Sequence, residues 1–163
     1  PLTPLKWYMC EYRTFSDAYE DLLGIIYDYS IENNLYNSQT RNKAYEDMER
    51  YYKNVKSFYS WFLYSKYPKE LENVRNQQLE GIEKFLRMLE MVNEYWKEIL
   101  EQDGNETVKF YKKKSEELNK KIQKEFGCTY RGLIKKVKNM GSKELENIFR
   151  KVVYELPENT GLK

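Results

Sequence analysis

Two cysteines, Cys10 and Cys128, are the side chains of this chain best suited to covalent chemistry. A disulfide between them would close a loop of over 100 residues. In the chain-entropy model such a cross-link stabilises a fold by about 4–5 kcal/mol. A disulfide would indicate an oxidising, extracytoplasmic location, whereas two unpaired buried thiols are the ordinary alternative. Both interpretations stay open from the sequence.

The chain contains no histidine. This absence removes Ser-His and Cys-His nucleophile pairs, most zinc sites, the usual general base near neutral pH and the Glu-x-x-His motif of di-iron bundles. None of the seven glycines forms a phosphate-binding loop. We therefore expect a protein that is not an enzyme and that holds no cofactor or metal. The remaining carboxylate clusters fall on helix faces expected to be outward: Glu46, Asp47 and Glu49, and Glu90, Glu94 and Glu98.

Basic side chains are concentrated towards the C-terminus. Residues 1–108 carry 13 basic and 19 acidic side chains, whereas residues 109–151 carry 14 basic and 5 acidic ones. Such a stretch is able to contact nucleic acid, anionic lipid or an acidic polymer. In the simpler alternative it faces the acidic remainder of the same chain, or only water. The candidate polyanion-binding residues are Lys112, Lys113, Lys120, Lys121, Lys124, Arg131, Lys135, Lys136 and Lys138.

Residues 129–153 have the outline of a DNA-binding helix-turn-helix, with the turn at Met140 and Gly141. Ser142, Asn147 and Arg150, however, occupy positions where that motif has apolar residues. The same outline fits any helical hairpin that closes a bundle. Binding of nucleic acid or another polyanion is therefore the alternative function.

Aromatic residues cover all sides of a predicted helix between Phe58 and Tyr64. A helix that is apolar all round is either buried all round or carries an exposed patch with a purpose. We expect the segment from Leu5 to Met9 and the closing hairpin to cover this surface. In the functional alternative it binds a partner, with Trp7, Phe58, Trp61 and Tyr64 as the candidate partner-binding residues.

Apolar residues recur every three or four positions through most of the chain, which is the helical period. The clearest stripe follows Pro68, a residue suited to the first position of a helix. Its members are Leu71, Val74, Ile82, Phe85, Leu89, Val92, Trp96 and Ile99, with Gln78 in phase among them. Thr14 and Asn105 are expected helix caps, and Gly127 is an expected helix stop. The pattern predicts main helices over residues 14–36, 40–66, 68–102 and 105–126, a helical hairpin over 129–155, and an extended arm over 1–13.

These elements predict a single all-α domain, an antiparallel up-down four-helix bundle with a short C-terminal helical hairpin. Loops of a few residues make consecutive helices antiparallel. The N-terminal arm, the Pro68 turn, the exit of the fourth helix and the hairpin then meet at one end of the bundle, here called the Pro68 end. We expect that end to collect Trp7, Phe58, Trp61, Tyr64 and both cysteines.

No apolar run approaches the roughly 20 residues of a membrane-spanning helix, and 33% of the residues are charged. We therefore expect no transmembrane segment in this chain. Because the chain opens with Pro1 rather than methionine, we expect that an upstream segment, such as a signal peptide or a lipid-anchor region, has been removed.

The stretch from Val55 to Phe85 resembles uncharacterised all-helical extracytoplasmic domains, often borne by lipoproteins, of low-GC Gram-positive bacteria. In those domains a helix ends in x-x-P-x-E-L and a second helix follows, and Pro68, Glu70, Leu71 and Leu79 fit that pattern. The histidine usual in those domains is missing, and Arg75 lies near its place. The resemblance covers about a fifth of the chain. It implies a location outside the membrane and no known catalytic residues.

Taken together, these patterns predict a non-enzymatic binding or scaffolding module, bacterial and extracytoplasmic, with a protein partner or a second copy of itself as the ligand.

Overall fold

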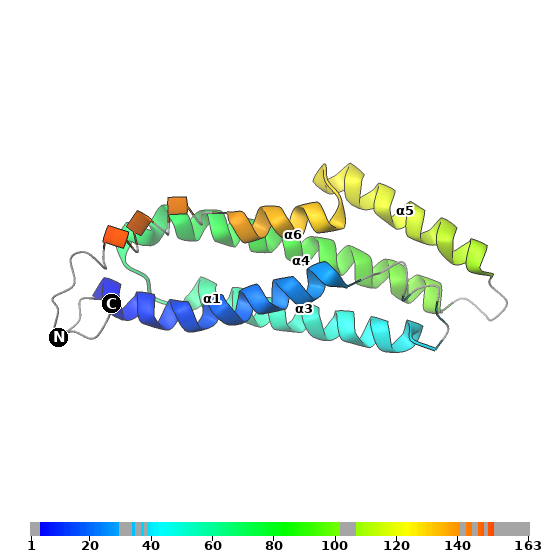
Figure 1. Cartoon of the computed structure of the whole chain (residues 1–163), viewed down its shortest axis with the longest axis horizontal. Coiled ribbons are helices and arrows are strands. Elements are labelled where there is room, and N and C mark those ends of the chain that lie inside the picture. The colour runs from blue at the N-terminus through cyan, green and yellow to red at the C-terminus, as the bar shows by residue number, and fades with distance from the viewer. Residues whose placement is uncertain are drawn as a thin grey trace.

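The computed structural model of the protein describes residues 4–29, 34, 37, 39–101, 107–140, 143–144, 147–148 and 150–151 (Figure 1). No strand occurs in those ranges, so the all-α prediction is confirmed for them. The elements are α1 (Pro4–Asp28), α3 (Arg41–Tyr64), the 3₁₀ turn η1 (Lys69–Leu71), α4 (Glu72–Leu100), α5 (Val108–Phe126) and α6 (Tyr130–Asn139).

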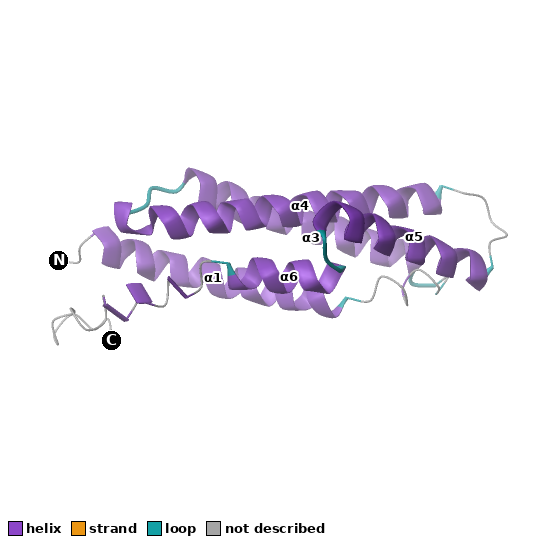
Figure 2. Cartoon of the chain, turned by 90° about the horizontal axis from the view of Figure 1, so that it is seen from above, coloured by secondary structure: helices purple, strands orange, loops and turns teal. Residues whose placement is uncertain are grey.

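Helices α1, α3 and α4 lie along the long axis of the molecule, and the view from above agrees (Figures 1 and 2). Helix α4 packs against α3, α5 and α6, while α1 packs against α3 and α6. Helix α5 begins at the end of the molecule far from the N-terminus and runs back to about its middle, where α6 continues towards the Pro68 end (Figure 1). Helices α5 and α6 therefore share the length that α4 covers alone.

The first helix begins earlier than the sequence pattern predicts. Residues 4–13 belong to α1, so the predicted extended arm over 1–13 is wrong for them, and Thr14 lies inside a helix rather than capping one. The reason is that Tyr8 and Tyr12 are four residues apart and both buried, which continues the stripe of Leu23 and Ile26. A proline such as Pro4 is tolerated in the first turn of a helix. The predicted helix end near residue 36 is also replaced by an end at Asp28.

Pro68 does not start the long helix itself. It has an extended backbone (ψ 146°) and precedes η1, whose turn is closed by the Leu71 N–H donating to the Pro68 carbonyl at 3.0 Å. The α-helical turns of α4 begin four residues after Pro68, at Glu72. Within the predicted helix over 68–102, the structure therefore has an α-helix from Glu72 to Leu100.

Polar caps and one glycine fix the ends of α5 and α6. The Thr107 hydroxyl accepts from the Phe110 N–H, and the Thr129 hydroxyl accepts from the Gly132 N–H at 3.0 Å, which satisfies backbone donors that a helix leaves unpaired. Gly127 ends α5 with φ 69°, a left-handed conformation that suits glycine, so the predicted stop is confirmed. The predicted Asn105 cap lies outside the described residues.

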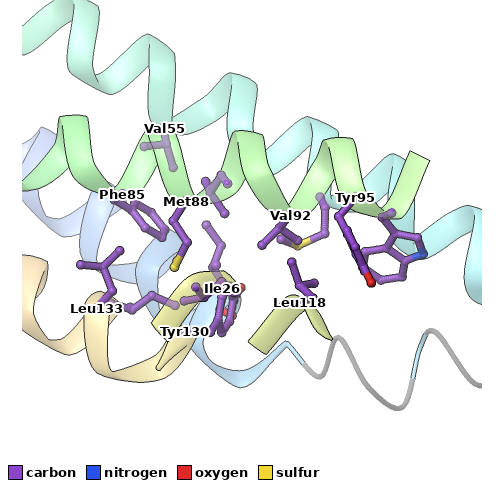
Figure 3. Packing of buried hydrophobic residues seen from close by; sticks show 14 of the residues in the cluster. Ile26, Val55, Phe85, Met88, Val92, Tyr95, Leu118, Tyr130 and Leu133 are labelled. Atoms are coloured by element: carbon purple, nitrogen blue, oxygen red, sulfur yellow. The ribbon is translucent and has the colours of Figure 1, made fainter. Parts of the chain in front are cut away.

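The predicted α4 stripe is the centre of the core. All eight of its apolar members are buried. In Figure 3 side chains of α4 meet those of the other helices, with Phe85, Met88, Val92 and Tyr95 close to Val55 of α3, Ile26 of α1, Leu118 of α5, and Tyr130 and Leu133 of α6. Full burial of one such aliphatic or aromatic side chain contributes about 1.5–3 kcal/mol. The second helix of the predicted hairpin falls mainly outside the described residues, although those described between 143 and 151 are helical.

Candidate functional site

The Pro68 end has an aromatic core of its own. Tyr8 and Tyr12 of α1 are buried with Phe62 of α3 and with Leu71 and Leu79. The Tyr8 and Tyr12 rings are stacked at 6.1 Å between centroids, and the Tyr12 and Phe62 centroids are 5.8 Å apart. The first turns of α1 are thus packed against the last turn of α3. This packing holds the exposed side chains of the Pro68 end on an ordered part of the molecule.

Arg75 caps the C-terminal end of α3. It is 9% exposed, and its Nη2 donates to the Leu63 carbonyl at 2.7 Å and to the Phe62 carbonyl at 3.4 Å. The guanidinium also lies 4.1 Å from the centroid of the Tyr67 ring. The last carbonyls of a helix lack intrahelical partners and carry partial negative charge, which a buried cation neutralises. Arg75 therefore holds the geometry of the Pro68 turn, a role that its position beside a stripe residue did not predict.

The four candidate partner-binding aromatics divide into two pairs. Trp7 is 63% exposed and Tyr64 is 81% exposed, and Leu63 beside Tyr64 is exposed as well. Phe58 and Trp61 instead pack against the core: Phe58 is stacked on Tyr19 at 4.2 Å and 7° between the planes, and Trp61 lies 6.0 Å from both Phe58 and Phe62. The aromatic surface is therefore covered on one side and open on the other.

An open groove lies between the first turns of α1 and the Pro68 turn. Its lining residues are Trp7, Tyr8, Cys10, Glu11 and Lys66, and its volume is about 550 Å³. The groove combines one exposed indole with both signs of charge. Burial raises the pKa of the Tyr8 hydroxyl, which also contacts Ser65, so this hydroxyl stays protonated. Such a mixture of an aromatic anchor and polar groups is typical of a surface that contacts another protein.

The structure does not bring the two cysteines together, so the expectation that both lie at the Pro68 end is wrong; of the two interpretations left open by the sequence, it favours unpaired thiols. Both thiols are free and half-buried. Beyond Cys128, the Tyr130 hydroxyl donates to the Ile26 carbonyl at 2.8 Å. Ile26 lies about 24 Å along α1 from Cys10 at ~1.5 Å per residue, whereas a disulfide needs Cα atoms within about 7 Å. The reason is length: α5 has 19 residues against 29 in α4, so it ends before the Pro68 end.

All nine candidate polyanion-binding residues are exposed on α5 and α6. Lys113, Lys120 and Lys124 lie on the outer face of α5, opposite its buried stripe. Among the described residues the ion pairs are Arg50–Asp47, Lys84–Glu80 and Lys114–Glu117, and none of them links the basic stretch to the acidic remainder. Lys121 lies over the Tyr95 ring, and Arg131 and Lys135 lie over the Tyr27 ring. The other six lysines face solvent.

Tyrosine hydroxyls bonded to glutamates connect α4 to its neighbours. Tyr59 donates to Glu83 at 2.5 Å and Tyr52 donates to Glu90, both between α3 and α4. Hydrogen bonding to these carboxylates is the main cause that raises the pKa of Tyr52 and of Tyr59 to about 12. Sequence reasoning missed these pairs. The sequence signal for these pairs is that the two tyrosines are seven residues apart on α3 and the two glutamates are seven residues apart on α4.

The described residues contain no group of three or more side chains placed to hold a metal ion. In the same part of the chain, no helix is both long enough and apolar enough to cross a membrane. No family model, no curated protein and no solved structure matches this chain. The functional proposal accordingly depends on the geometry of the two surfaces described above.

Proposed function

We propose that this protein is a non-enzymatic binding or scaffolding module and that its Pro68 end contacts a protein partner. The observation that carries the proposal is the exposure of Trp7 and Tyr64, at 63% and 81%, on a well-packed end of the molecule. Tryptophan and tyrosine are enriched in the parts of interfaces that contribute most to binding. Their exposure on a monomer is therefore typical of an unoccupied contact surface.

The ordered packing beneath the exposed side chains of the Pro68 end favours binding through this end. The Tyr8 and Tyr12 rings lie directly beneath the first turns of α1, and Arg75 fixes the last turn of α3. A surface that is already ordered loses less conformational entropy on association than a disordered one. The partner therefore binds a surface that is already folded, and this surface does not have to fold on binding.

The scaffold we propose is an antiparallel up-down bundle in which α5 and α6 occupy the fourth position one after the other, with residues 143–155 as the closing part of a hairpin. We also propose a bacterial source and a location outside the membrane. The support for that location is the resemblance of Val55–Phe85 to extracytoplasmic helical domains.

Selection of peptides from a displayed library against the wild-type protein tests the proposal. Peptides selected on the wild type should lose at least tenfold in affinity for the double variant Trp7→Ala/Tyr64→Ala. The matched control is Val108→Ala, which removes an exposed apolar side chain at the opposite end of the molecule. Sedimentation of both variants measures self-association in the same way. Equal affinity for the wild type and the double variant would refute the Pro68 end as the contact surface.

A second candidate function, polyanion binding, is favoured by one observation: the nine candidate polyanion-binding residues of α5 and α6 are all exposed, and none of these nine forms an ion pair with an acidic side chain among the described residues. Affinity from such contacts falls steeply with salt because counterions are released. A salt titration against duplex DNA measures this slope. Lys113→Gln/Lys120→Gln/Lys124→Gln should reduce it, whereas Lys43→Gln/Lys53→Gln/Lys56→Gln, with the same change in charge on α3, should not. Absence of binding at low ionic strength excludes this function.

A further inference from the structure

A cavity of about 60 Å³ lies where α6 meets α1, α3 and α4, and the exposed residues Glu20 and Lys138 form part of its wall. Tyr12 and Tyr19 of α1, Phe58 of α3, Gln78 and Ile82 of α4, and Val137 of α6 contribute to its wall. Four helices thus close around one space. The rest of its wall combines apolar side chains with two hydroxyls and one amide.

The Tyr19 hydroxyl is the unexplained group in this wall. Its ring is stacked on Phe58, which holds the side chain in place. The oxygen is buried and has no hydrogen-bond partner. Burial raises the pKa of Tyr19, so the hydroxyl keeps its proton and remains a donor. In native proteins the large majority of buried polar atoms have a partner in the protein or in ordered water.

Gln78 provides the second polar group. It is the one polar side chain in phase with the apolar stripe of α4, between Val74 and Ile82. Its Nε2 donates to the Tyr12 hydroxyl at 2.9 Å. A partly buried amide such as that of Gln78 is stable when water in a neighbouring cavity provides hydrogen-bond partners. Water in the same cavity would also provide a partner for the Tyr19 hydroxyl.

We propose that this cavity is a hydration site in which ordered water molecules bind the Tyr19 hydroxyl and the polar groups of Gln78 and Tyr12. One water needs roughly 10–15 Å³ and at least two polar partners, and this cavity supplies both. Water in this site links α1 to α4. Val137 of α6 forms another part of the cavity wall. Tyr12 and Phe62 line the cavity and also belong to the aromatic core of the Pro68 end, so the two sites adjoin.

Substitution of Tyr19 by phenylalanine gives opposite results for a hydrated and a dry cavity. In a hydrated cavity Tyr19→Phe removes a hydrogen bond, and the equilibrium constant for unfolding rises about threefold to tenfold. In a dry cavity the same change removes an unpaired buried hydroxyl, and the constant falls. Tyr51→Phe, at a half-buried tyrosine outside the cavity, gives the baseline. A fall, or a rise no larger than that of Tyr51→Phe, overturns the proposal.

Xenon binding gives a second, independent readout. Dry apolar cavities take up xenon, whereas a space filled by hydrogen-bonded water does not. We expect no xenon-dependent shift of the Ile82 and Val137 methyl signals in the wild-type protein under xenon pressure, and we expect water-to-amide cross-relaxation at Gln78. Xenon-dependent shifts at both methyl groups would overturn the proposal.

Discussion

The Tyr59 hydroxyl on α3 donates a hydrogen bond to the Glu83 carboxylate on α4, and seven residues along each helix Tyr52 makes the same bond to Glu90. Moving seven residues back on α3 corresponds to moving seven residues forward on α4. This is the relationship of two neighbouring helices that run in opposite directions with a heptad repeat. In the same register the next pair would be Tyr45 and Lys97, and Tyr45 instead donates to Glu49 of its own helix at 2.8 Å.

Removal of the two interhelical hydroxyls should weaken the α3–α4 contact without changing the fold. We expect Tyr52→Phe and Tyr59→Phe each to lower the free energy of unfolding by about 0.5–1 kcal/mol, the lower part of the range for a hydrogen bond because both pairs reach the surface. Urea unfolding measures the change. A double-mutant cycle of Tyr59→Phe with Glu83→Gln should show coupling, and strict additivity would contradict the bond.

Stability should fall at high pH because these tyrosines ionise late. Their folded pKa of about 12 lies above the ordinary value of 10.0. A group with a raised folded pKa contributes stability that is complete below the unfolded pKa and is lost as pH rises through the folded pKa. The free energy of unfolding should therefore be constant up to about pH 9 and decrease between about pH 10 and 12. Chemical unfolding at each pH measures it, and the Tyr52→Phe/Tyr59→Phe variant should show a smaller decrease.

Gly81 of α4 lies against the side chain of Met140, which follows α6. A Cβ at this position would overlap the Met140 sulfur. At an exposed helix position, Gly→Ala stabilises by about 0.5–1 kcal/mol. Here we expect Gly81→Ala to give no such gain and Gly81→Val to cost about 1–3 kcal/mol through overpacking. In a Met140→Ala background the Gly81→Ala gain should reappear. A full gain with Met140 intact would contradict the close approach.

Arg75 should be the costliest charge to remove from the described residues. Arg75→Met leaves the Leu63 and Phe62 carbonyls without their donor, and hydrogen bonds to charged groups contribute about 1.5–3 kcal/mol. Arg87→Met, at an exposed position of the same helix, is the control and should change stability by less than about 0.5 kcal/mol. Thermal unfolding of both variants measures the difference. Similar values for the two would show that the α3 end does not need this cap.

Local patterns predicted the parts of the fold that depend on local physics. The α4 stripe follows from a period that any helix packed on one side must show, and Gly127 follows from the conformational freedom of glycine. The helical start of α1 was missed because Pro1 and Pro4 indicate an extended segment, whereas burial of Tyr8 and Tyr12 on Phe62 favours a helix there. That burial is a tertiary effect, and the sequence pattern alone does not contain it.

The candidate site was predictable only where exposure follows from helix periodicity. The outward position of the α5 lysines follows from the buried stripe on the opposite face of that helix. The expectation that both cysteines lie at the Pro68 end failed because it assumed that the fourth helix reaches that end, and α5, with 19 residues against 29 in α4, is too short to do so. The interhelical tyrosine–glutamate pairs require the register between α3 and α4. The capping role of Arg75 was not predictable because it depends on which backbone carbonyls lie at the end of α3.

The break at Gly127 divides the molecule into parts of unequal resistance to opening. Helix α5 packs against α4 and α6 and has four buried residues, whereas twelve residues are buried along α4. Local opening free energy follows buried contact, so the amides of α5 should exchange with solvent deuterium well before those of α4. The helix with the outward lysines is thus the one that the protein can release while the rest of its core stays intact.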